Sequence, residues 1–290
     1  TTLSGRARLP NLSNWTAERR GPIIPAMLIT RRDILKVAGA TAAFNALDVN
    51  AAWAADVKVG LIFPPLNYPI PPAAKRLYPA GVEFLSGGVG LPGGMSIAGY
   101  EEAVPRIIPA AEALAKQGAK AISVFGSSIT FYNGAKFNEE LVSRVTKATG
   151  LPATTQSNGL LDGLKTAGAK RVAVATAYTD IVTERLRLFL TEHGFTVTAA
   201  KGLGFERIPE GAATQEILHK LGATAYAMSN KADALVMSCG ALRTLDLIVP
   251  LEKELGVPVV SSTPHGLMDA VRLVGVSPRA QGFGMVFAKA

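Results

Sequence analysis

The one cysteine of the chain, Cys239, lies in the stretch Val-Met-Ser-Cys-Gly-Ala at residues 236–241. An apolar run at 234–237 precedes it, and a helix-like segment follows at once. A short buried strand that ends in this way brings a thiol, with backbone N–H groups beside it, to the carboxyl edge of a sheet. Ligands bind at that edge in open α/β sheets. A single cysteine is often only a small buried apolar residue, so the surrounding residues must show whether Cys239 has a chemical role.

An internal repeat pairs Cys239 with a glycine. Gly-Leu-Pro at 150–152, followed by Gly-Leu-Leu-Asp at 159–162, recurs as Gly-Val-Pro at 256–258, followed by Gly-Leu-Met-Asp at 266–269. The strand before each copy leads into Val-Phe-Gly-Ser-Ser at 124–128 and Met-Ser-Cys-Gly-Ala at 237–241. In this register Gly126 faces Cys239 across a cleft between two similar halves.

This pairing limits the chemistry that the cleft can perform. A cysteine on each side would suit racemisation, because one thiolate removes a proton from carbon and the opposite thiol returns one. Here Cys239 can protonate a planar carbanion from one face, but Gly126 offers no matching base. The carbanion must therefore arise by another route, and loss of CO2 is the obvious one.

The elements that position these residues alternate between strand and helix from residue 57 onward, which predicts parallel sheets with right-handed crossovers. Strands are predicted at residues 57–63, 119–125, 153–155, 171–177, 195–200, 234–237 and 257–260. Helices are predicted at residues 100–117, 138–148, 159–167, 180–192, 214–229, 242–255 and 267–274. Residues 66–94, rich in Pro and Gly, are predicted to form long loops with one short strand near 82–85, as in a lid or pocket wall.

The expected fold is therefore α/β, with two pseudo-symmetric Rossmann-like halves. Each half would be a mainly parallel sheet flanked by helices, and the active site would lie in the cleft between them. We expect the first half at residues 55–170 and the second at 171–290, with the last helix of the chain able to pack back on the first half.

Composition agrees with this plan. At 290 residues and 48% hydrophobic content the chain can bury a large core. One cysteine excludes an intramolecular disulfide and a thiolate-rich metal site. The net charge is +8, but residues 1–54 alone hold seven Lys or Arg against three Asp or Glu. No basic cluster with interleaved aromatic residues suggests a nucleic-acid partner.

The first 54 residues are predicted to be a targeting leader. Arg31 and Arg32 precede an apolar run at 37–47 that is too short to span a bilayer, and the small-x-small pattern Ala-Trp-Ala follows at 52–54. Residues 27–54 resemble a bacterial twin-arginine signal. We expect a periplasmic protein that begins near Ala55 and meets the membrane only during export. A basic amphipathic helix on a cytoplasmic protein is the alternative.

Several further segments carry a resemblance to a known family. They are Ile-Phe-Pro-Pro at 62–65, Arg-Leu-Tyr-Pro at 76–79, Gly-Ser-Ser-Ile-Thr-Phe-Tyr at 126–132, Ala-Thr-Ala-Tyr at 175–178, Ser-Cys-Gly at 238–240, Val-Val-Ser-Ser-Thr-Pro at 259–264 and Asp-Ala-Val-Arg-Leu at 269–273. Over residues 57–287 the chain resembles the arylmalonate decarboxylase family of the aspartate/glutamate racemase superfamily. The racemases and maleate isomerases of that superfamily carry a second cysteine where this chain has Gly126.

The resemblance implies decarboxylation of a disubstituted arylmalonate with no metal and no organic cofactor. The retained carboxylate would be held by Ser127, Ser128, Tyr178 and the backbone at Cys239 and Gly240, which stabilise an enediolate as an oxyanion hole does. Cys239 would then protonate one face, giving one enantiomer of an α-aryl acid. An apolar wall for the departing carboxylate is expected from Pro64, Leu91 and Tyr100.

Other interpretations remain open from the sequence. A racemase or maleate isomerase would need a base on the Gly126 side, and a periplasmic ligand-binding protein would also suit a two-lobed cleft. Ser127 and Ser128 could only cap a helix, and Tyr178 could be an ordinary aromatic residue at a strand end. His265, expected in a loop near the cleft, is an extra titratable group that could change the shape of the substrate pocket and favour a different acid as substrate. The expected partner is a small carboxylic acid, and the expected state is a monomer.

Overall fold

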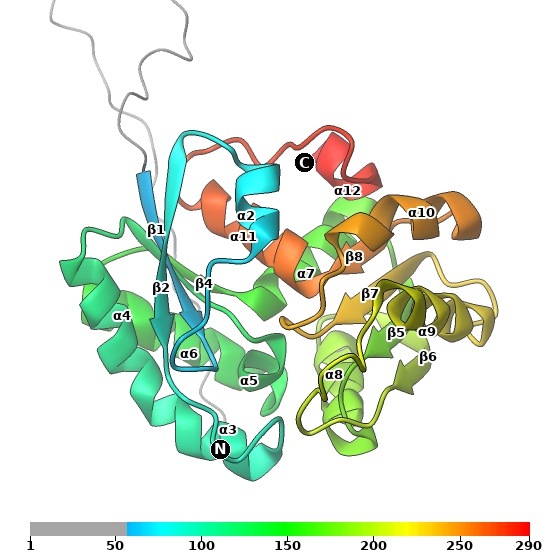
Figure 1. The fold of residues 1–290 in the computed structure, drawn as a ribbon, viewed down its shortest axis with the longest axis horizontal. Helices are drawn as coiled ribbons and strands as arrows, with labels where there is room; N and C mark the ends of the chain where they lie inside the picture. Colours follow the sequence, from blue (N-terminus) through cyan, green and yellow to red (C-terminus); the bar gives the residue numbers. More distant parts are fainter. Residues whose placement is uncertain (1–56) are drawn as a thin grey trace, which may run out of the picture. The chain divides into compact units, whose positions relative to one another are not determined.

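The structure is a computed structural model that describes residues 57–290, and these hold two four-stranded sheets (Figure 1). Every strand pair within each sheet is parallel. The first sheet has the order β2-β1-β3-β4 and the second the order β6-β5-β7-β8. The strands are β1 (Val57–Phe63), β2 (Val82–Gly88), β3 (Ala121–Val124), β4 (Ala153–Thr155), β5 (Arg171–Thr176), β6 (Thr196–Gly202), β7 (Ala234–Ser238) and β8 (Val259–Ser261).

Helices connect these strands and pack on the sheets. In the first half they are α2 (Pro72–Leu77), α3 (Ile97–Ala103), the 3-10 turn η1 (Val104–Arg106), α4 (Ile107–Lys116), α5 (Ser127–Phe131), α6 (Gly134–Thr149) and α7 (Gln156–Ala167). After β5 they are α8 (Asp180–Glu192), α9 (Gln215–Ala227), α10 (Leu245–Leu255), α11 (Ser262–Arg272) and α12 (Met285–Lys289). None of the helices within residues 57–290 combines the length and the apolar character that a membrane span requires.

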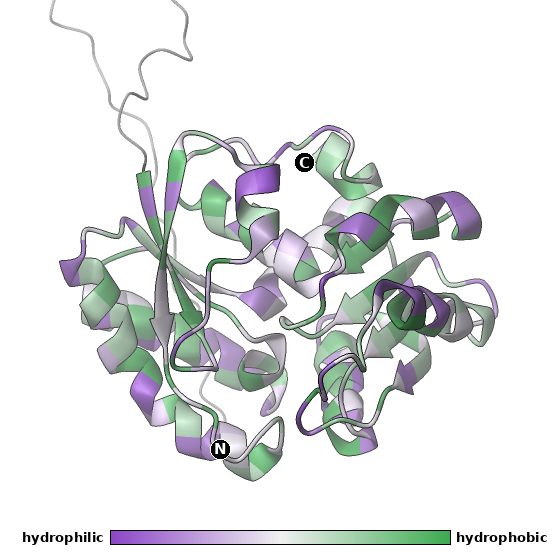
Figure 2. Cartoon of the chain, viewed as in Figure 1, coloured by the Kyte–Doolittle hydropathy of each residue, from purple (hydrophilic) through white to green (hydrophobic). Residues whose placement is uncertain are grey.

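Both sheets repeat one topology, because each half orders its strands second, first, third, fourth. This confirms the predicted fold class of two similar halves with parallel sheets. Burial explains why the central strands form: every residue of β3 and of β7 is buried. Figure 2 shows β7 as apolar, while the helices carry both polar and apolar residues. Strands covered on both faces are expected to be apolar throughout.

The segment predicted to be mostly loop contains more regular structure than expected. β2 runs for seven residues and pairs with β1 along its whole length, and α2 precedes it. The expected single helix at 100–117 is divided into α3, η1 and α4, and Pro105 lies inside the 3-10 turn between them. Proline removes a backbone donor, so a helix that reaches it is interrupted.

The segment after Cys239 also differs from expectation. α10 begins at Leu245 and does not follow the thiol directly. The intervening residues form a turn in which the Leu242 N–H donates to the Cys239 carbonyl at 3.1 Å. The thiol is therefore carried on a turn between strand and helix, and the backbone around it is not committed to helical hydrogen bonds.

The two halves meet where the two copies of the repeat meet, at α7 and α11 (Figure 1). A Cβ atom added to Gly159 would lie 2.7 Å from the Gly266 Cα and 2.6 Å from the His265 carbonyl oxygen. Only glycine allows two helix backbones to approach so closely. α12 also contacts α7. The glycines of the repeat therefore hold the two helices in direct backbone contact.

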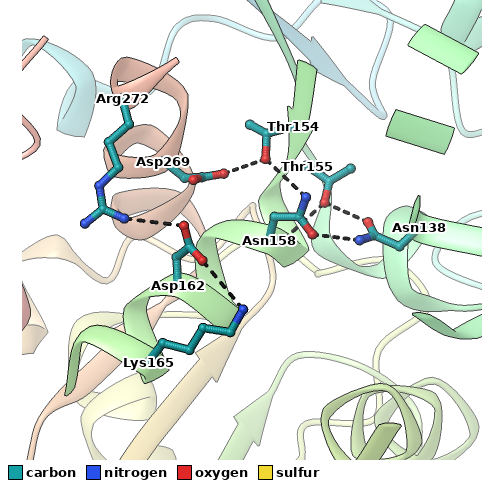
Figure 3. Close-up of polar contacts among 8 residues, drawn as sticks. All are labelled: Asn138, Thr154, Thr155, Asn158, Asp162, Lys165, Asp269 and Arg272. Atoms are coloured by element: carbon teal, nitrogen blue, oxygen red, sulfur yellow. Dashed lines mark hydrogen bonds and ion pairs between the residues drawn. The ribbon is translucent and has the colours of Figure 1, made fainter. Parts of the chain in front are cut away.

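The aspartates of the repeat lie in a polar cluster beside this contact (Figure 3). Thr154 Oγ1 donates to Asp269 Oδ2 at 2.5 Å, and Arg272 Nη1 lies 3.4 Å from Asp162 Oδ2. Burial raises the pKa of Asp269 to about 7, and the nearby Asp162 carboxylate adds to the shift. Asp269 is thus a proton-binding group at the joint between the halves.

The expected leader lies outside the described residues. The predicted twin-arginine signal at 27–54 and the start of the mature chain near Ala55 therefore stay predictions.

Candidate active site

The ends of four strands enclose one cavity. In each sheet the first and third strands of the half are neighbours, β1 with β3 and β5 with β7, and the chain crosses over in opposite directions from there. Such a point opens a crevice at the carboxyl ends of the strands. A cavity of about 110 Å³, here called the inner cavity, lies there. Its lining is Phe63, Pro64, Pro65, Tyr68, Leu91, Met95, Phe125, Gly126, Ser128, Tyr178, Cys239, Gly240 and Ala241.

The thiol of Cys239 is nearly enclosed in this cavity. Cys239 follows β7 directly, is 5% exposed and is not in a disulfide. Its Sγ lies 3.9 Å from the Met95 Sδ. Burial raises the pKa of the thiol, and the backbone of Ala241 and the Tyr178 hydroxyl offset only part of that shift. The group is therefore a neutral thiol at neutral pH, which is the form that an acid needs.

Gly126 lines the same cavity from the other half. Its φ is +100°, in the left-handed region that favours glycine. A Cβ atom at this position would lie 2.4 Å from the Pro64 Cγ. The structure therefore brings Gly126 and Cys239 into one cavity, and both the backbone conformation and the contact with Pro64 disfavour a side chain on the Gly126 side.

Of the two serines expected to hold a carboxylate, only Ser128 lines the cavity. Ser127 is fully buried behind the wall. Its Oγ lies 3.1 Å from the Tyr178 hydroxyl, 3.0 Å from the Ser262 Oγ and 3.3 Å from the Ser238 Oγ. The expectation of direct substrate contact by Ser127 is thus not matched by its position, because its hydroxyl is used to hold Tyr178.

Tyr178 presents its hydroxyl to the cavity wall while its ring packs in the core. The residue follows β5, is fully buried, and contacts the Phe131 ring edge-on with centroids 5.9 Å apart. Burial raises the pKa of Tyr178 well above its usual range, and the Cys239 thiol adds to the shift. The phenol is therefore a permanent hydrogen-bond donor.

The backbone beside the thiol contributes one further donor. The Cys239 N–H is directed at the Ser262 Oγ at 3.3 Å, so it is already engaged. Within residues 57–290 no group accepts a hydrogen bond from the Gly240 N–H. Gly240 lines the cavity, and its carbonyl accepts from Thr263 Oγ1 at 2.9 Å. Of the groups expected to hold a carboxylate, Ser128, Tyr178 and the Gly240 backbone are thus the ones that can meet an anion in the cavity.

Gln156, which the sequence did not suggest, connects the loops of the two halves. Its Oε1 accepts from the Gly126 N–H and the Ser127 N–H, both at 2.8 Å. Its Nε2 donates to Thr263 Oγ1 at 3.0 Å, and Thr263 in turn holds Gly240. Gln156 is fully buried at the first position of α7. The internal repeat offers one signal that could have identified Gln156. At the corresponding place the second copy has Ser262 and Thr263, and these residues hydrogen-bond the loop at Cys239 and Gly240.

The apolar wall differs in part from the expected one. Pro64 and Leu91 line the inner cavity, but Tyr100 does not. Tyr100 is fully buried behind the wall, and within the described chain its hydroxyl has no hydrogen-bond partner. Burial raises the pKa of Tyr100, and the neighbouring Ser128 offsets part of that shift. The side chains that sequence reasoning missed, Phe63, Tyr68, Met95 and Phe125, complete the wall.

His265 is not part of the cavity. It lies in α11 rather than in a loop, it is fully buried, and its ring stacks on Phe287 with centroids 4.8 Å apart. Its Nδ1 accepts from the Ser261 N–H at 3.0 Å. Burial lowers the pKa of His265 to about 4. The ring is therefore a neutral structural group, and the expected position of His265 in a loop near the cleft is wrong.

Comparison with known proteins agrees with this site. A family model described as arylmalonate decarboxylase matches residues 59–287. The arylmalonate decarboxylase of Bordetella bronchiseptica is 42% identical over 231 residues, which cover 79% of this chain and 95% of that protein. A crystal structure of arylmalonate decarboxylase is 40% identical with a TM-score of 0.71, covering 80% of this chain and 100% of that chain.

A structure of maleate cis-trans isomerase from Nocardia farcinica has the same fold, with a TM-score of 0.74 at 21% identity over 81% of this chain and 100% of that chain. Two Rossmann-like halves around one cleft thus define an enzyme of the racemase and maleate isomerase superfamily. Within it, the chain belongs to the arylmalonate decarboxylase family, and it is a carboxy-lyase.

Proposed function

We propose that this chain decarboxylates a disubstituted arylmalonate through an enediolate that Cys239 protonates from one face. One observation carries the proposal: the inner cavity holds a protonated thiol on one side and Gly126 on the other. Family membership supports decarboxylation over the isomerase and binding-protein alternatives. A cysteine that only served ligand binding would not need to face the cavity as a neutral acid.

The retained carboxylate is held by three donors. The Ser128 hydroxyl, the Tyr178 hydroxyl and the Gly240 N–H all border the inner cavity. As the carbon–carbon bond to the leaving carboxylate breaks, its electron pair moves toward the retained carboxylate and forms an enediolate. Fixed donors stabilise this growing charge, and one such donor contributes about 3–4 kcal/mol in related oxyanion sites. Ser127 and Gln156 keep the donors in place and do not contact the substrate.

The departing carboxylate faces the apolar side of the cavity. Phe63, Pro64, Leu91 and Met95 supply this side. A carboxylate loses hydration there without gaining a partner, whereas neutral CO2 has little hydration to lose. The wall therefore favours the products over the bound dianion.

Protonation completes the reaction. Cys239 transfers its proton to the α-carbon of the enediolate, and water then reprotonates the thiolate. Apart from Cys239, the titratable side chains that line the inner cavity are Tyr68 and Tyr178. Burial raises the pKa of both tyrosines, so neither is a base that could remove a proton from the opposite face. The product is a single enantiomer.

The test is proton NMR in D2O with 2-methyl-2-phenylmalonate and, separately, with aspartate, glutamate and maleate. The proposal expects singly deuterated 2-phenylpropionate from the malonate. Cys239→Ser should lose nearly all turnover while still binding the malonate, with Thr155→Val, whose side chain faces Asn138, as a folded control. Reaction of an amino acid or of maleate instead, with the malonate untouched, would show that an isomerase base is present.

Export is a separate proposal. The paired arginines at 31 and 32 and the apolar run after them support a twin-arginine signal at 27–54, and hence a periplasmic enzyme. Fusion of residues 27–60 to a reporter should give export that stops when both arginines are changed to lysine. Equal export by the lysine variant would contradict this proposal.

A further inference from the structure

A second cavity opens beside the inner one. It measures about 290 Å³ and shares Tyr68, Gly240 and Ala241 with the inner cavity. We call it the outer cavity. Its remaining lining comes from the Pro-rich segment that leads into α2, from α2 itself, from the turn between Cys239 and α10, and from the first residues of α10 and α11. A molecule whose reacting carbon lies at Cys239 can therefore extend past Tyr68 into the outer cavity.

Most polar groups of the outer cavity are already paired. Arg76 of α2 forms an ion pair with Asp246 of α10, with 2.7 Å and 2.9 Å between its nitrogens and the carboxylate oxygens. Thr263 Oγ1 donates to the Gly240 carbonyl, and Thr244 Oγ1 bonds with Ser261. These groups have little capacity left for a ligand.

Arg243 is the exception. It lines the outer cavity, is exposed, and within residues 57–290 its guanidinium pairs with no carboxylate. Its carbonyl is held by Gln215 Nε2 at 2.6 Å, which fixes the backbone from which the side chain extends. Burial raises the pKa of Tyr68, whereas Arg243 lowers it, so the positive charge is felt at the junction of the two cavities. Because the charges of Arg76 and Asp246 cancel each other, the net positive charge of the lining comes from Arg243.

We propose that the outer cavity is a substrate subsite that takes the arm on the malonate carbon, and that it prefers arms ending in an anionic group, which Arg243 binds. This inference rests on the proposed decarboxylation and names its substrate class: aryl- or alkyl-malonates with a third, distal acid. The inner cavity has no charged side chain in its lining, whereas the outer cavity has Arg243, so a distal charge is accommodated better in the outer cavity.

The competing explanation is general steering. A positive side chain near the entrance raises the rate of association of any dianion, whatever its arm. Steering grows with the total charge of the substrate, so it also favours an acid arm, but it is screened by salt and is weakened by loss of other surface cations, whereas a subsite depends on Arg243. The two are separated by comparing arms of equal size at high ionic strength, in variants of Arg243 and of a lysine outside both cavities.

The experiment measures kcat/KM for two 2-methyl-2-arylmalonates that differ only in the para substituent, carboxymethyl or carboxamidomethyl. Wild type should prefer the acid by about two- to fivefold, the range of an ion pair between exposed groups. Arg243→Gln should remove the preference, and Arg243→Lys should keep part of it. Lys220→Gln, which removes an exposed charge on α9 outside both cavities, should change nothing.

Three results would overturn the subsite: no preference in wild type, an equal fall for both arms in Arg243→Gln, or an equal effect of Lys220→Gln. If neither malonate is decarboxylated, the proposed function fails, and the subsite is then tested by calorimetry with the two corresponding arylpropionates. A tighter binding of the acid arm that Arg243→Gln abolishes would uphold the subsite, and equal affinities would reject it.

Discussion

The side chain of Gln156 offers the sharpest test of how the two halves build one site. Replacing it by Leu removes the acceptor for the Gly126 and Ser127 N–H groups and the donor to Thr263. Each buried donor left without a partner costs about 1–3 kcal/mol. Gln156→Leu should therefore lower the free energy of unfolding by about 2–5 kcal/mol, and because the two loops are no longer joined, lower kcat by about 10- to 100-fold.

The matched control is Thr155→Val, one residue earlier. Thr155 is also fully buried, but its Oγ1 donates to Asn138 Oδ1 at 2.7 Å and accepts from the Asn158 N–H at 3.1 Å, away from the cavity. Loss of this cap and of the bond to the buried Asn138 should cost about 1–3 kcal/mol of stability with kcat unchanged. Urea unfolding followed by circular dichroism and initial rates with an arylmalonate measure both quantities. If Gln156→Leu behaved like Thr155→Val, with full activity in the folded protein, the bridge would have no role in positioning the donors.

Three further outcomes follow from the site. Gly126→Cys should let the enzyme racemise its α-aryl acid product. It should also lower stability, because the new Cβ would lie 2.4 Å from Pro64 Cγ at a φ of +100°. Chiral chromatography measures racemisation and a thermal melt measures stability, and a product that remained a single enantiomer would refute the facing arrangement. Because burial raises the pKa of Cys239, the alkaline fall of kcat/KM should lie above the ordinary thiol value of about 8.5, and a fall centred below it would exclude the thiol as the acid. Burial raises the pKa of Asp269 from 3.8 to about 7, so the folded protein binds this proton more tightly than the unfolded chain does. Stability should therefore decline as pH rises from about 4 to 7, and Asp269→Asn should flatten that slope. Urea unfolding midpoints at about pH 4, 5.5 and 7 test this expectation.

The parts of this site that the sequence predicted are those recorded in its repeat. Cys239 and Gly126 both follow a buried strand, and the two copies of the Gly-Leu-x-Asp pattern align them. Local sequence is sufficient there, because residues that directly follow parallel strands reach the same sheet edge. Tyr178 follows β5 and could be placed for the same reason.

Other residues depend on contacts that no local pattern reveals. Gln156 follows a strand, as many residues at helix starts do, so its position alone is not distinctive. Its role depends on hydrogen bonds to residues 30 positions before it and 107 positions after it. Tyr68 and Tyr100 both lie between β1 and β3, and nothing in the local sequence distinguishes their roles. Only the fold determines that Tyr68 lines the cavity while Tyr100 lies behind it. β2 was underestimated because Ser86-Gly87-Gly88 has low strand propensity, which pairing with β1 overrides.

The backbone contact between α7 and α11 also determines how the cleft can move. With Gly159 and Gly266 touching, the halves cannot slide past one another there, and the contact acts as a pivot. The halves meet again on the side of the inner cavity formed by Met95, where the Met95 N–H donates to the Glu206 carbonyl at 2.7 Å and Arg207 donates to the Pro92 carbonyl. Rotation about a pivot displaces distant points most, so opening of the cleft would have to break these bonds. On this side the closed cleft is held by one backbone bond and one side-chain bond, in addition to the Arg76–Asp246 ion pair and the Gln156–Thr263 bond that also join the halves.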